Sequence, residues 1–262
     1  MPPDSPEVNN ATAADHELAE ALATRAGELL VDLRVQLLRD GADRNALKDE
    51  GDRQAHVLLM AALAERISAG DAVLSEEGAD DPIRLERSRV WIVDPLDGTR
   101  EFGEPPRTDW AVHVALTIDG RPVAGAVALP AMGITLSTQH PPPLPPASPS
   151  APRVIVSRSR PPAAATFLAE QLGGQLIEMG SAGAKAMAVV RGEADIYVHS
   201  GGQYEWDSCA PVAVAMAAGL HTSRIDGAPL IYNRLEPYLP DLLICRTELA
   251  ARSLQALASF RG

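Results

Sequence analysis

The sequence predicts a layered protein with an α+β first half and an α/β second half. Two long helical patterns come first, and strand-like runs joined by hairpin signals follow, which is typical of helices packed on an antiparallel sheet. Beyond a proline-rich stretch, strand and helix patterns alternate, as they do in α/β domains. With 262 residues, the chain has room for one large domain or for two of about 100–150 residues.

Two helices are expected in the first half, after a polar, proline-containing tail over residues 1–12. Leucines recur at helical spacing from Ala13 to Leu38, which predicts a long amphipathic helix. The charged residues 45–52 indicate a loop. Asp52 then stands where an acid caps a second helix, which reaches Ile67. Capping alone would explain an aspartate at this position.

The rest of the first half is expected to form the sheet. Its apolar runs are bounded by turn residues, and Asp119-Gly120 is a hairpin signal between two of them. The expected strands cover residues 70–75, 90–93, 110–118, 121–129 and 133–138.

A stretch of prolines over residues 139–152 is predicted to link a domain of residues 13–138 to a domain of residues 153–262. The second domain is expected to complete whatever site the first one begins. Its expected strands cover residues 153–156, 175–179, 195–198 and 242–245, and its expected helices cover residues 161–172, 180–190, 209–218 and 247–259.

The bulk properties exclude several classes of function. A net charge of −12 argues against binding a nucleic acid polymer or an anionic membrane. No apolar run is long enough to span a membrane, and no signal peptide pattern opens the chain, so we expect a cytoplasmic protein. Cys209 and Cys245 are expected to be buried thiols rather than a disulfide.

The most informative stretch is Asp94-Pro95-Leu96-Asp97-Gly98-Thr99, directly after a strand that is apolar on both faces. Unpaired carboxylates resist burial, and a bound cation such as Mg²⁺ resolves that conflict. Because Pro95 fixes its own φ, it bends the chain so that Asp94, Asp97 and the Leu96 carbonyl can surround one centre. The Gly98 and Thr99 amides could face an anion, and the Thr99 hydroxyl could hold a water.

Two further acids are expected near this turn, although each has an ordinary explanation. Glu76 ends the neighbouring strand, where acids are usually solvated loop residues. Asp207 stands at the apparent start of a helix, where a capping role is equally reasonable. His113 lies within a strand pattern and is expected to be a sheet histidine outside the site. An all-oxygen set of carboxylates fits Mg²⁺ shared with a substrate phosphate, and two such ions would clamp an in-line phosphoryl displacement.

Three motifs together resemble the signatures of the inositol monophosphatase superfamily: Ser75-Glu76-Glu77, Asp94-Pro95-Leu96-Asp97-Gly98-Thr99 and Trp206-Asp207-Ser208-Cys209-Ala210-Pro211. Their order and spacing match over a region from about Ala13 to the end of the chain. Residues 99–102, 156–159 and 205–207 are most similar to 3′(2′),5′-bisphosphate nucleotidases of the CysQ type. Tyr232-Asn233 and the run 237–241 are similar to actinobacterial members.

The resemblance implies an αβαβα layered sandwich, a lithium-sensitive phosphatase that uses two or three Mg²⁺ ions, and a homodimer. It places the metal ligands and catalytic groups at Glu76, Asp94, the Leu96 carbonyl, Asp97 and Asp207, with Asp52 and Thr99 serving a third metal and the attacking water. It places substrate contacts at Asp97, Gly98, Thr99, Ser157, Gly180, Ser181, Lys185 and Glu205. One departure stands out, because the family's loop before its second helix is shortened here to Lys48-Asp49-Glu50-Gly51-Asp52.

The expected reaction is therefore hydrolysis of the 3′-phosphate of adenosine 3′,5′-bisphosphate, or of its sulfated relative, without a covalent intermediate. Inositol phosphate or fructose 1,6-bisphosphate remains an alternative substrate, and a non-catalytic metal-binding protein remains an alternative class. An aspartyl-phosphate mechanism is disfavoured, because its Asp-x-Asp-Gly-Thr pattern would need an acid where Pro95 stands.

Overall fold

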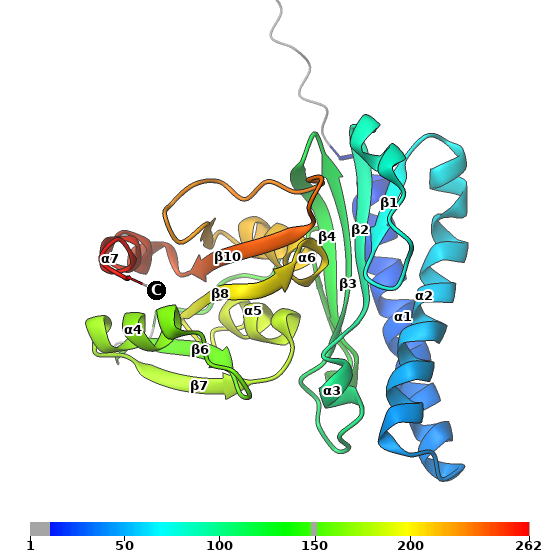
Figure 1. Cartoon of the computed structure of the whole chain (residues 1–262), viewed down its shortest axis with the longest axis horizontal. Coiled ribbons are helices and arrows are strands. Elements are labelled where there is room, and N and C mark those ends of the chain that lie inside the picture. Colours follow the sequence, from blue (N-terminus) through cyan, green and yellow to red (C-terminus); the bar gives the residue numbers. More distant parts are fainter. Residues whose placement is uncertain (1–10, 148–150, 262) are drawn as a thin grey trace, which may run out of the picture.

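The computed structural model describes residues 11–147 and 151–261, and it shows five layers (Figure 1). Two long helices cover the outer face of one sheet, two helices lie between this sheet and a second one, and two more cover the far face of the second sheet. This confirms the predicted αβαβα sandwich. Residues 1–10 of the predicted tail and 148–150 of the predicted linker lie outside the described residues.

The helices in the described part of the chain are α1 (Ala13–Arg39), α2 (Arg44–Ser68), α3 (Thr99–Phe102), α4 (Ala163–Leu172), α5 (Ala182–Val190), α6 (Glu205–Ala217) and α7 (Thr247–Leu257), with two short 3-10 helices, η1 (Pro82–Glu86) and η2 (Pro130–Met132). None of them is long and apolar enough to cross a membrane. Cys209 and Cys245 are both buried and free, as expected.

The first sheet contains β1 (Ala72–Ser75), β2 (Arg89–Asp97), β3 (Ala111–Ile118), β4 (Arg121–Leu129) and β5 (Ile134–Ser137), in that order. The hairpins from β2 to β5 are antiparallel, as predicted. β1 is instead parallel to β2, with Ser75 opposite Val93. The residues that follow both strands therefore meet at one edge, where the sequence places acids.

The second sheet has the order β7-β6-β8-β10-β9. Its strands are β6 (Arg153–Ser157), β7 (Gln175–Met179), β8 (Ile196–Tyr204), β9 (His221–Ser223) and β10 (Tyr238–Cys245). β6 runs parallel to β7 and β8, whereas β10 pairs antiparallel with β8 and β9. This mixed sheet carries the alternating strand and helix pattern of the second half.

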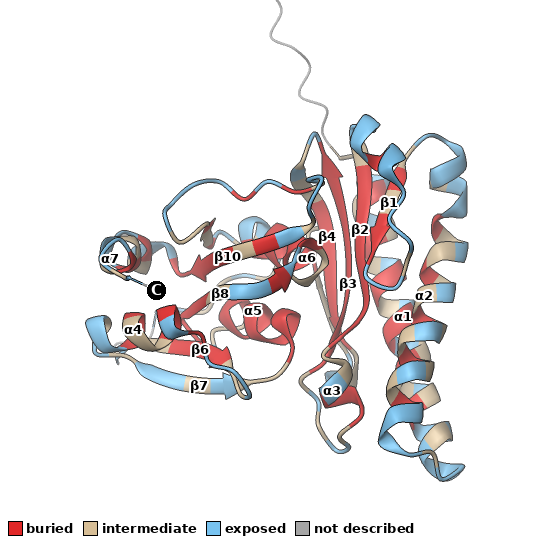
Figure 2. Cartoon of the chain, viewed as in Figure 1, coloured by how far each residue is buried: buried red, intermediate tan, exposed pale blue. Residues whose placement is uncertain are grey.

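One apolar core joins the two halves of the chain. It combines Ile92 of β2 with Met187 of α5 and with Tyr197 and Leu242 of the second sheet, so α5 and α6 are buried from both sides (Figure 2). Leu144, from the predicted linker, packs against the same cluster. The halves therefore share their interior rather than folding around separate cores.

The predicted loop over residues 45–52 is wrong, because α2 already begins at Arg44 with Asp43 as its cap. Arg44 and Asp49 are exposed on the outer face of this helix, while Leu47 and Gly51 are buried. Gly51 fits closely, since an added Cβ would lie 2.8 Å from Phe102 Cε1. Asp52 is thus inside a helix and does not cap one.

The predicted boundaries around residue 200 are also wrong. β8 continues through Gly201 and Gly202 to Tyr204, because these glycines adopt φ of 77° and 78° within a strand still paired to β10. α6 then begins at Glu205 rather than at Cys209, although Pro211 lies inside it. These glycines resemble a loop in the sequence, and only the pairing to β10 shows that the strand continues.

Candidate active site

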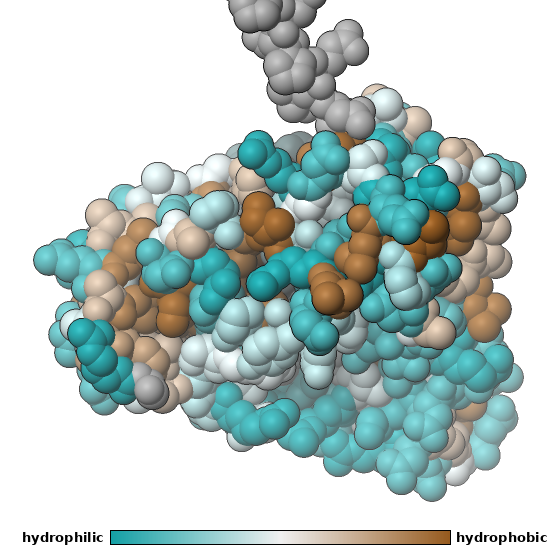
Figure 3. All heavy atoms as spheres, turned by 45° about the horizontal axis from the view of Figure 1, so that its top comes forward, coloured by the Kyte–Doolittle hydropathy of each residue, from teal (hydrophilic) through white to brown (hydrophobic). Residues whose placement is uncertain are grey.

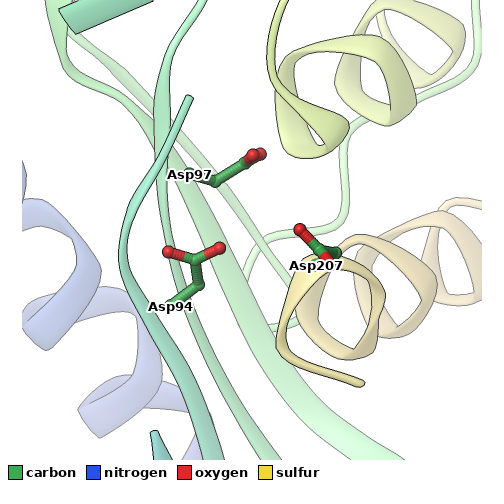
Figure 4. A group of neighbouring side chains, drawn as sticks. All are labelled: Asp94, Asp97 and Asp207. Atoms are coloured by element: carbon green, nitrogen blue, oxygen red, sulfur yellow. The ribbon is translucent and has the colours of Figure 1, made fainter. Parts of the chain in front are cut away.

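Three aspartates converge where the end of β2 meets the start of α6. One carboxylate oxygen from each of Asp94, Asp97 and Asp207 lies within 4.8 Å of the others. Figure 4 shows the three side chains pointing into the same space, two from β2 and one from α6. Asp94 bends the chain here, since its Oδ1 accepts a hydrogen bond from the Leu96 amide at 3.0 Å. The structure therefore brings together aspartates separated by more than 100 positions in the sequence.

Asp97 is held by the second half of the chain. Its two carboxylate oxygens accept hydrogen bonds from the amides of Ala182 (3.1 Å) and Gly183 (2.6 Å), in the first turn of α5. Burial alone would raise its pKa, but His113, Lys185 and the Gly183 amide together lower it below the usual aspartate value. Asp97 is therefore stabilised as a carboxylate by the protein itself.

His113 is a buried histidine of the sheet, as predicted, but it also contacts Asp97, which the sequence analysis did not expect. It is fully buried on β3, with Nδ1 2.9 Å from the Trp206 carbonyl and Nε2 3.2 Å from Asp97 Oδ2. Because a carbonyl only accepts hydrogen bonds, Nδ1 carries the proton. His113 thus connects Asp97 to the residue before Asp207. No local pattern predicts this contact, because it depends on the register of β3 on β2, which places His113 opposite Asp94.

Asp94 lies in a very different environment. It is fully buried, and burial together with the carboxylates of Glu76 and Asp97 raises its pKa well above the usual value. Burial and neighbouring acids also raise the pKa of Asp207 to about 7. Glu76 has a pKa raised to about 7 for the same reasons, although its exposed surface lets water screen part of the effect. No lysine or arginine pairs with these three acids among the described residues.

Asp207 plays both roles that the sequence allowed. As the third residue of α6, it accepts a hydrogen bond from the Tyr204 amide at 2.6 Å, so it stabilises the start of the helix. The same side chain faces Asp94 and Asp97. The side chain therefore stabilises the start of the helix and also lies in the carboxylate cluster.

Thr99 links the turn to helix α2. Its hydroxyl lies 3.1 Å from the Leu96 carbonyl and 3.3 Å from Asp52 Oδ1. Burial, followed by the charge of Glu77, raises the pKa of Asp52 to about 7. Asp52 therefore reaches the site from the middle of a helix, and its carboxyl group can exchange a proton near neutral pH.

Gly98 and the start of α5 approach one another closely. Gly98 adopts φ +84°, and an added Cβ there would lie 2.8 Å from Ser181 Cβ. A Cβ on Gly180 would lie 2.4 Å from Glu101 Cγ. Ser181 itself is buried and caps α5 through the Ala184 amide. These three predicted substrate contacts thus form the seam between the two halves of the chain.

Lys185 is not a surface lysine. It is only 4% exposed, and its ammonium donates to the Gly180 and Ser181 carbonyls, the latter at 2.7 Å. Burial lowers its pKa, against the opposing charges of Asp97 and Asp207. Lys185 thus brings a buried positive charge close to the carboxylates.

A cavity of about 420 Å³ opens at the end of β6 and the middle of β8. Ser157, Arg160 and His199 line it, together with Gly201 and Gly202. Burial, with the nearby charges of Lys185 and Arg160, lowers the pKa of His199 to about 4, so this histidine is neutral at pH 7. The cavity therefore contains the cationic side chain of Arg160, and the charge of Lys185 acts on His199 in its wall.

Glu205 does not face this cavity. Its side chain is fully buried, and its two oxygens accept hydrogen bonds from the amides of Asn233 (2.6 Å) and Arg234 (2.9 Å). Because both carboxylate oxygens already accept hydrogen bonds from backbone amides, Glu205 does not make the expected substrate contact in this structure.

The donor set fits a hard divalent cation. Carboxylate and carbonyl oxygens are the ligands such ions prefer. Burial and neighbouring carboxylates raise the pKa values of Asp94 and Asp207, an effect that a bound cation would offset. Asp94, Asp97 and Asp207 would hold the ion, with Glu76 at the open side. The Leu96 carbonyl, now bonded to Thr99, lies beside them.

Comparisons with known proteins agree with this geometry. The model of the inositol monophosphatase family matches residues 10–258. A Mycobacterium leprae protein described as a 3′-phosphoadenosine 5′-phosphate phosphatase is 50% identical over 254 residues, covering 92% of each chain. The Escherichia coli 3′(2′),5′-bisphosphate nucleotidase CysQ is 33% identical, covering 72% of this chain and 80% of that protein. The crystal structure of CysQ from Bacteroides thetaiotaomicron aligns with a TM-score of 0.74 at 27% identity, covering 89% of this chain and 97% of that one.

Proposed function

The chain belongs to the inositol monophosphatase family and is a phosphoric monoester hydrolase, and we propose that it removes the 3′-phosphate of adenosine 3′,5′-bisphosphate. The products are AMP and inorganic phosphate. Adenosine 3′-phosphate 5′-phosphosulfate, which has the same 3′-phosphate, is a second substrate of this class. The relatives' names support the nucleotide, and the geometry of the site supports the ester hydrolysis.

The cofactor in this proposal is Mg²⁺, as two or three ions on the carboxylates of Glu76, Asp94, Asp97 and Asp207. When bound, such ions neutralise phosphate charge and lower the pKa of a water. The chain itself supplies a rigid frame, because Asp97 is fixed by two amides and Asp207 by the start of α6. Rigid placement of the reacting groups is where most of the rate in such reactions comes from.

Thr99 and Asp52 are the residues we assign to the attacking water. The Thr99 hydroxyl and the Asp52 carboxylate already lie 3.3 Å apart, so one water can contact both. With a pKa of about 7, Asp52 can accept a proton at neutral pH. The amides of Gly98 and Thr99 would receive oxygens of the scissile phosphate.

The observation that carries the nucleotide assignment is the cavity lined by Ser157, Arg160 and His199. A bisphosphate needs a second anion site in addition to the one at the carboxylates. Arg160 offers a charge there and Ser157 a hydroxyl, in a space of about 420 Å³. Inositol 1-phosphate has no second phosphate, so it would leave this cation without a partner.

The first test measures phosphate release with Mg²⁺ from adenosine 3′,5′-bisphosphate, inositol 1-phosphate and fructose 1,6-bisphosphate, with and without lithium. We expect a strong preference for the nucleotide and inhibition by lithium. Equal rates on all three esters would indicate a broad phosphatase. No release from any of them would reject the enzyme assignment and favour a metal-binding protein.

A variant of the cavity sharpens the test. Arg160→Ala should raise KM for adenosine 3′,5′-bisphosphate by about 10- to 100-fold, because a charged hydrogen bond contributes about 1.5–3 kcal/mol. Adenosine 3′-monophosphate lacks the second phosphate and is the matched control, so its KM should stay unchanged. An equal change of KM for both nucleotides would show that Arg160 does not bind the second phosphate.

A further inference from the structure

We propose that Arg84, Asn233 and Glu205 form a clasp that positions Asp207 against the loop after Glu76, and thereby sets the affinity of the site for divalent cations. None of the three touches the aspartates that converge at the site. The inference rests on the proposed function only for the identity of the metal site. The clasp also accounts for Tyr232-Asn233, a motif that the proposed reaction does not use.

The first half of the clasp is Arg84, which lies in η1 between β1 and β2. Its side chain is only 1% exposed. Its guanidinium donates to Asn233 Oδ1 and to the Arg234 carbonyl, both at 2.9 Å, while Asp80 pairs with its other side. Asn233 Nδ2 returns a hydrogen bond to the Arg84 carbonyl at 2.9 Å. One asparagine side chain therefore bonds both the main chain and the side chain of Arg84.

The second half of the clasp is Glu205, the first residue of α6. Its carboxylate holds the amides of Asn233 and Arg234, and its own amide donates to the Pro237 carbonyl at 2.8 Å. One helical turn further on, Ser208 Oγ lies 3.2 Å from the Tyr232 hydroxyl. The start of α6 is therefore fixed to residues 232–237 on both sides of Asp207.

The segment thus connects the two halves of the chain at the metal site. In Figure 1 the loop between β9 and β10 crosses from the second sheet towards the top of the first one. Asn233 adopts φ +56°, a conformation that asparagine tolerates better than most residues. Its amide bonds Glu205 and its side chain bonds Arg84, so this one residue joins the ligand-bearing helix to the loop that begins at Glu76.

Polar bonds hold this segment around Asn233, while the neighbouring Tyr232 is buried in the shared apolar core. Ile83, Leu85 and Leu235 remain 39%, 40% and 72% exposed beside the buried charges. Figure 3 turns this face forward and shows apolar side chains on the surface among polar ones. Buried charges contribute little net stability but impose a defined geometry, which is the property a metal site needs.

The test is a Mn²⁺ titration of the full chain, with free Mn²⁺ followed by electron paramagnetic resonance. Asn233→Gly removes both side-chain bonds to Arg84 while allowing the positive φ. We expect Mn²⁺ to bind about tenfold more weakly, and kcat at saturating metal to stay within about twofold. In an Asp207→Asn background, the same change should produce no further loss, because the clasp acts through Asp207.

The matched control is Arg153→Ala. Arg153 also forms a partly buried pair, with Asp195, but all its partners lie in the second half of the chain. The Arg153→Ala variant should have a lower melting temperature and an unchanged affinity for Mn²⁺. Wild-type affinity in Asn233→Gly, or an equal loss in the control, would overturn the proposal. If phosphate release fails with every ester while Asn233→Gly still weakens Mn²⁺ binding, the clasp stands and the proposed reaction does not.

Discussion

The two sides of the carboxylate cluster are built in opposite ways. On one side, Asp97 is charged and satisfied, with two amides of α5, His113 and Lys185 around it. On the other side, Asp94 and Glu76 face each other without a lysine or arginine partner among the described residues. The Asp97 side is complete without a metal, whereas the Asp94 side favours protonation until a cation arrives. The first holds the two halves of the chain together, and the second leaves carboxylates whose charge a bound cation would neutralise.

The largest expected effects come from replacing Asp94 or Asp97, and the two replacements should change the stability of the protein in opposite directions. Asp94→Asn and Asp97→Asn should each lower kcat/KM by about a thousandfold, since both remove a charge from the site. In metal-free protein at pH 8, however, Asp94→Asn should be stabilising because it removes an uncompensated buried charge. Asp97→Asn should cost about 1–3 kcal/mol because one α5 amide loses its acceptor.

Urea denaturation with a chelator measures both free energies of unfolding. Should the two variants change stability in the same direction, the two sides of the cluster would not differ as described.

The second prediction concerns pH. In metal-free protein, Asp207 has a pKa of about 7 when folded and near 4 when unfolded, so the folded chain binds more protons between these values. Stability should therefore fall as pH rises from about 4 to 7, by about 4 kcal/mol for Asp207 alone. Melting temperatures recorded with a chelator across this range measure the slope, and Asp207→Asn should reduce it.

Saturating Mg²⁺ should reverse this trend, because binding to the deprotonated acids releases protons and becomes tighter as pH rises. If the stability of the metal-free protein instead rises from about pH 5 to 7, the conclusion that burial and neighbouring acids raise the pKa of Asp207 is wrong.

The third prediction distinguishes catalysis from metal binding on the Asp94 side. Thr99→Ala removes the hydroxyl between Asp52 and the Leu96 carbonyl, and should lower kcat by about a hundredfold. Mn²⁺ affinity should stay within about threefold, since no carboxylate is lost. Thr99→Ser keeps the hydroxyl and serves as the control. Normal turnover in the alanine variant would show that Thr99 has no part in the reaction.

The smallest effect tests the fit on the Asp97 side. A Cβ on Gly183 would lie 2.0 Å from His113 Nε2, so Gly183→Ala should destabilise the fold by about 1–3 kcal/mol. Because the clash is with one side chain, the double variant His113→Ala/Gly183→Ala should be more stable than the sum of its parts. Additive losses in a double-mutant cycle would place the strain elsewhere.

The sequence by itself determined the layered fold, most of its strands and helices, and the aspartates that cluster at the end of β2 and the start of α6. Hydrophobic periodicity reports which face of each element is buried, and the Asp94–Thr99 turn carries its chemistry in adjacent residues. The sequence could not show that Asp52 points inward from a helix, because the many charged residues between 45 and 52 are typical of a loop.

Only the tertiary structure decided the roles of His113, Lys185 and Glu205. A histidine in a strand pattern, a lysine in a helix and a glutamate before Asp207 each have several ordinary explanations in the sequence. Strand register places His113 beside Asp97, and packing of α5 between the sheets buries Lys185. The carboxylate of Glu205 accepts hydrogen bonds from the amides of Asn233 and Arg234, in the loop before β10. These contacts join residues that lie 16 to about 90 positions apart in the sequence. The hydrophobic pattern of one helix or strand predicts which of its residues are buried, but it does not predict which distant residues pack against them.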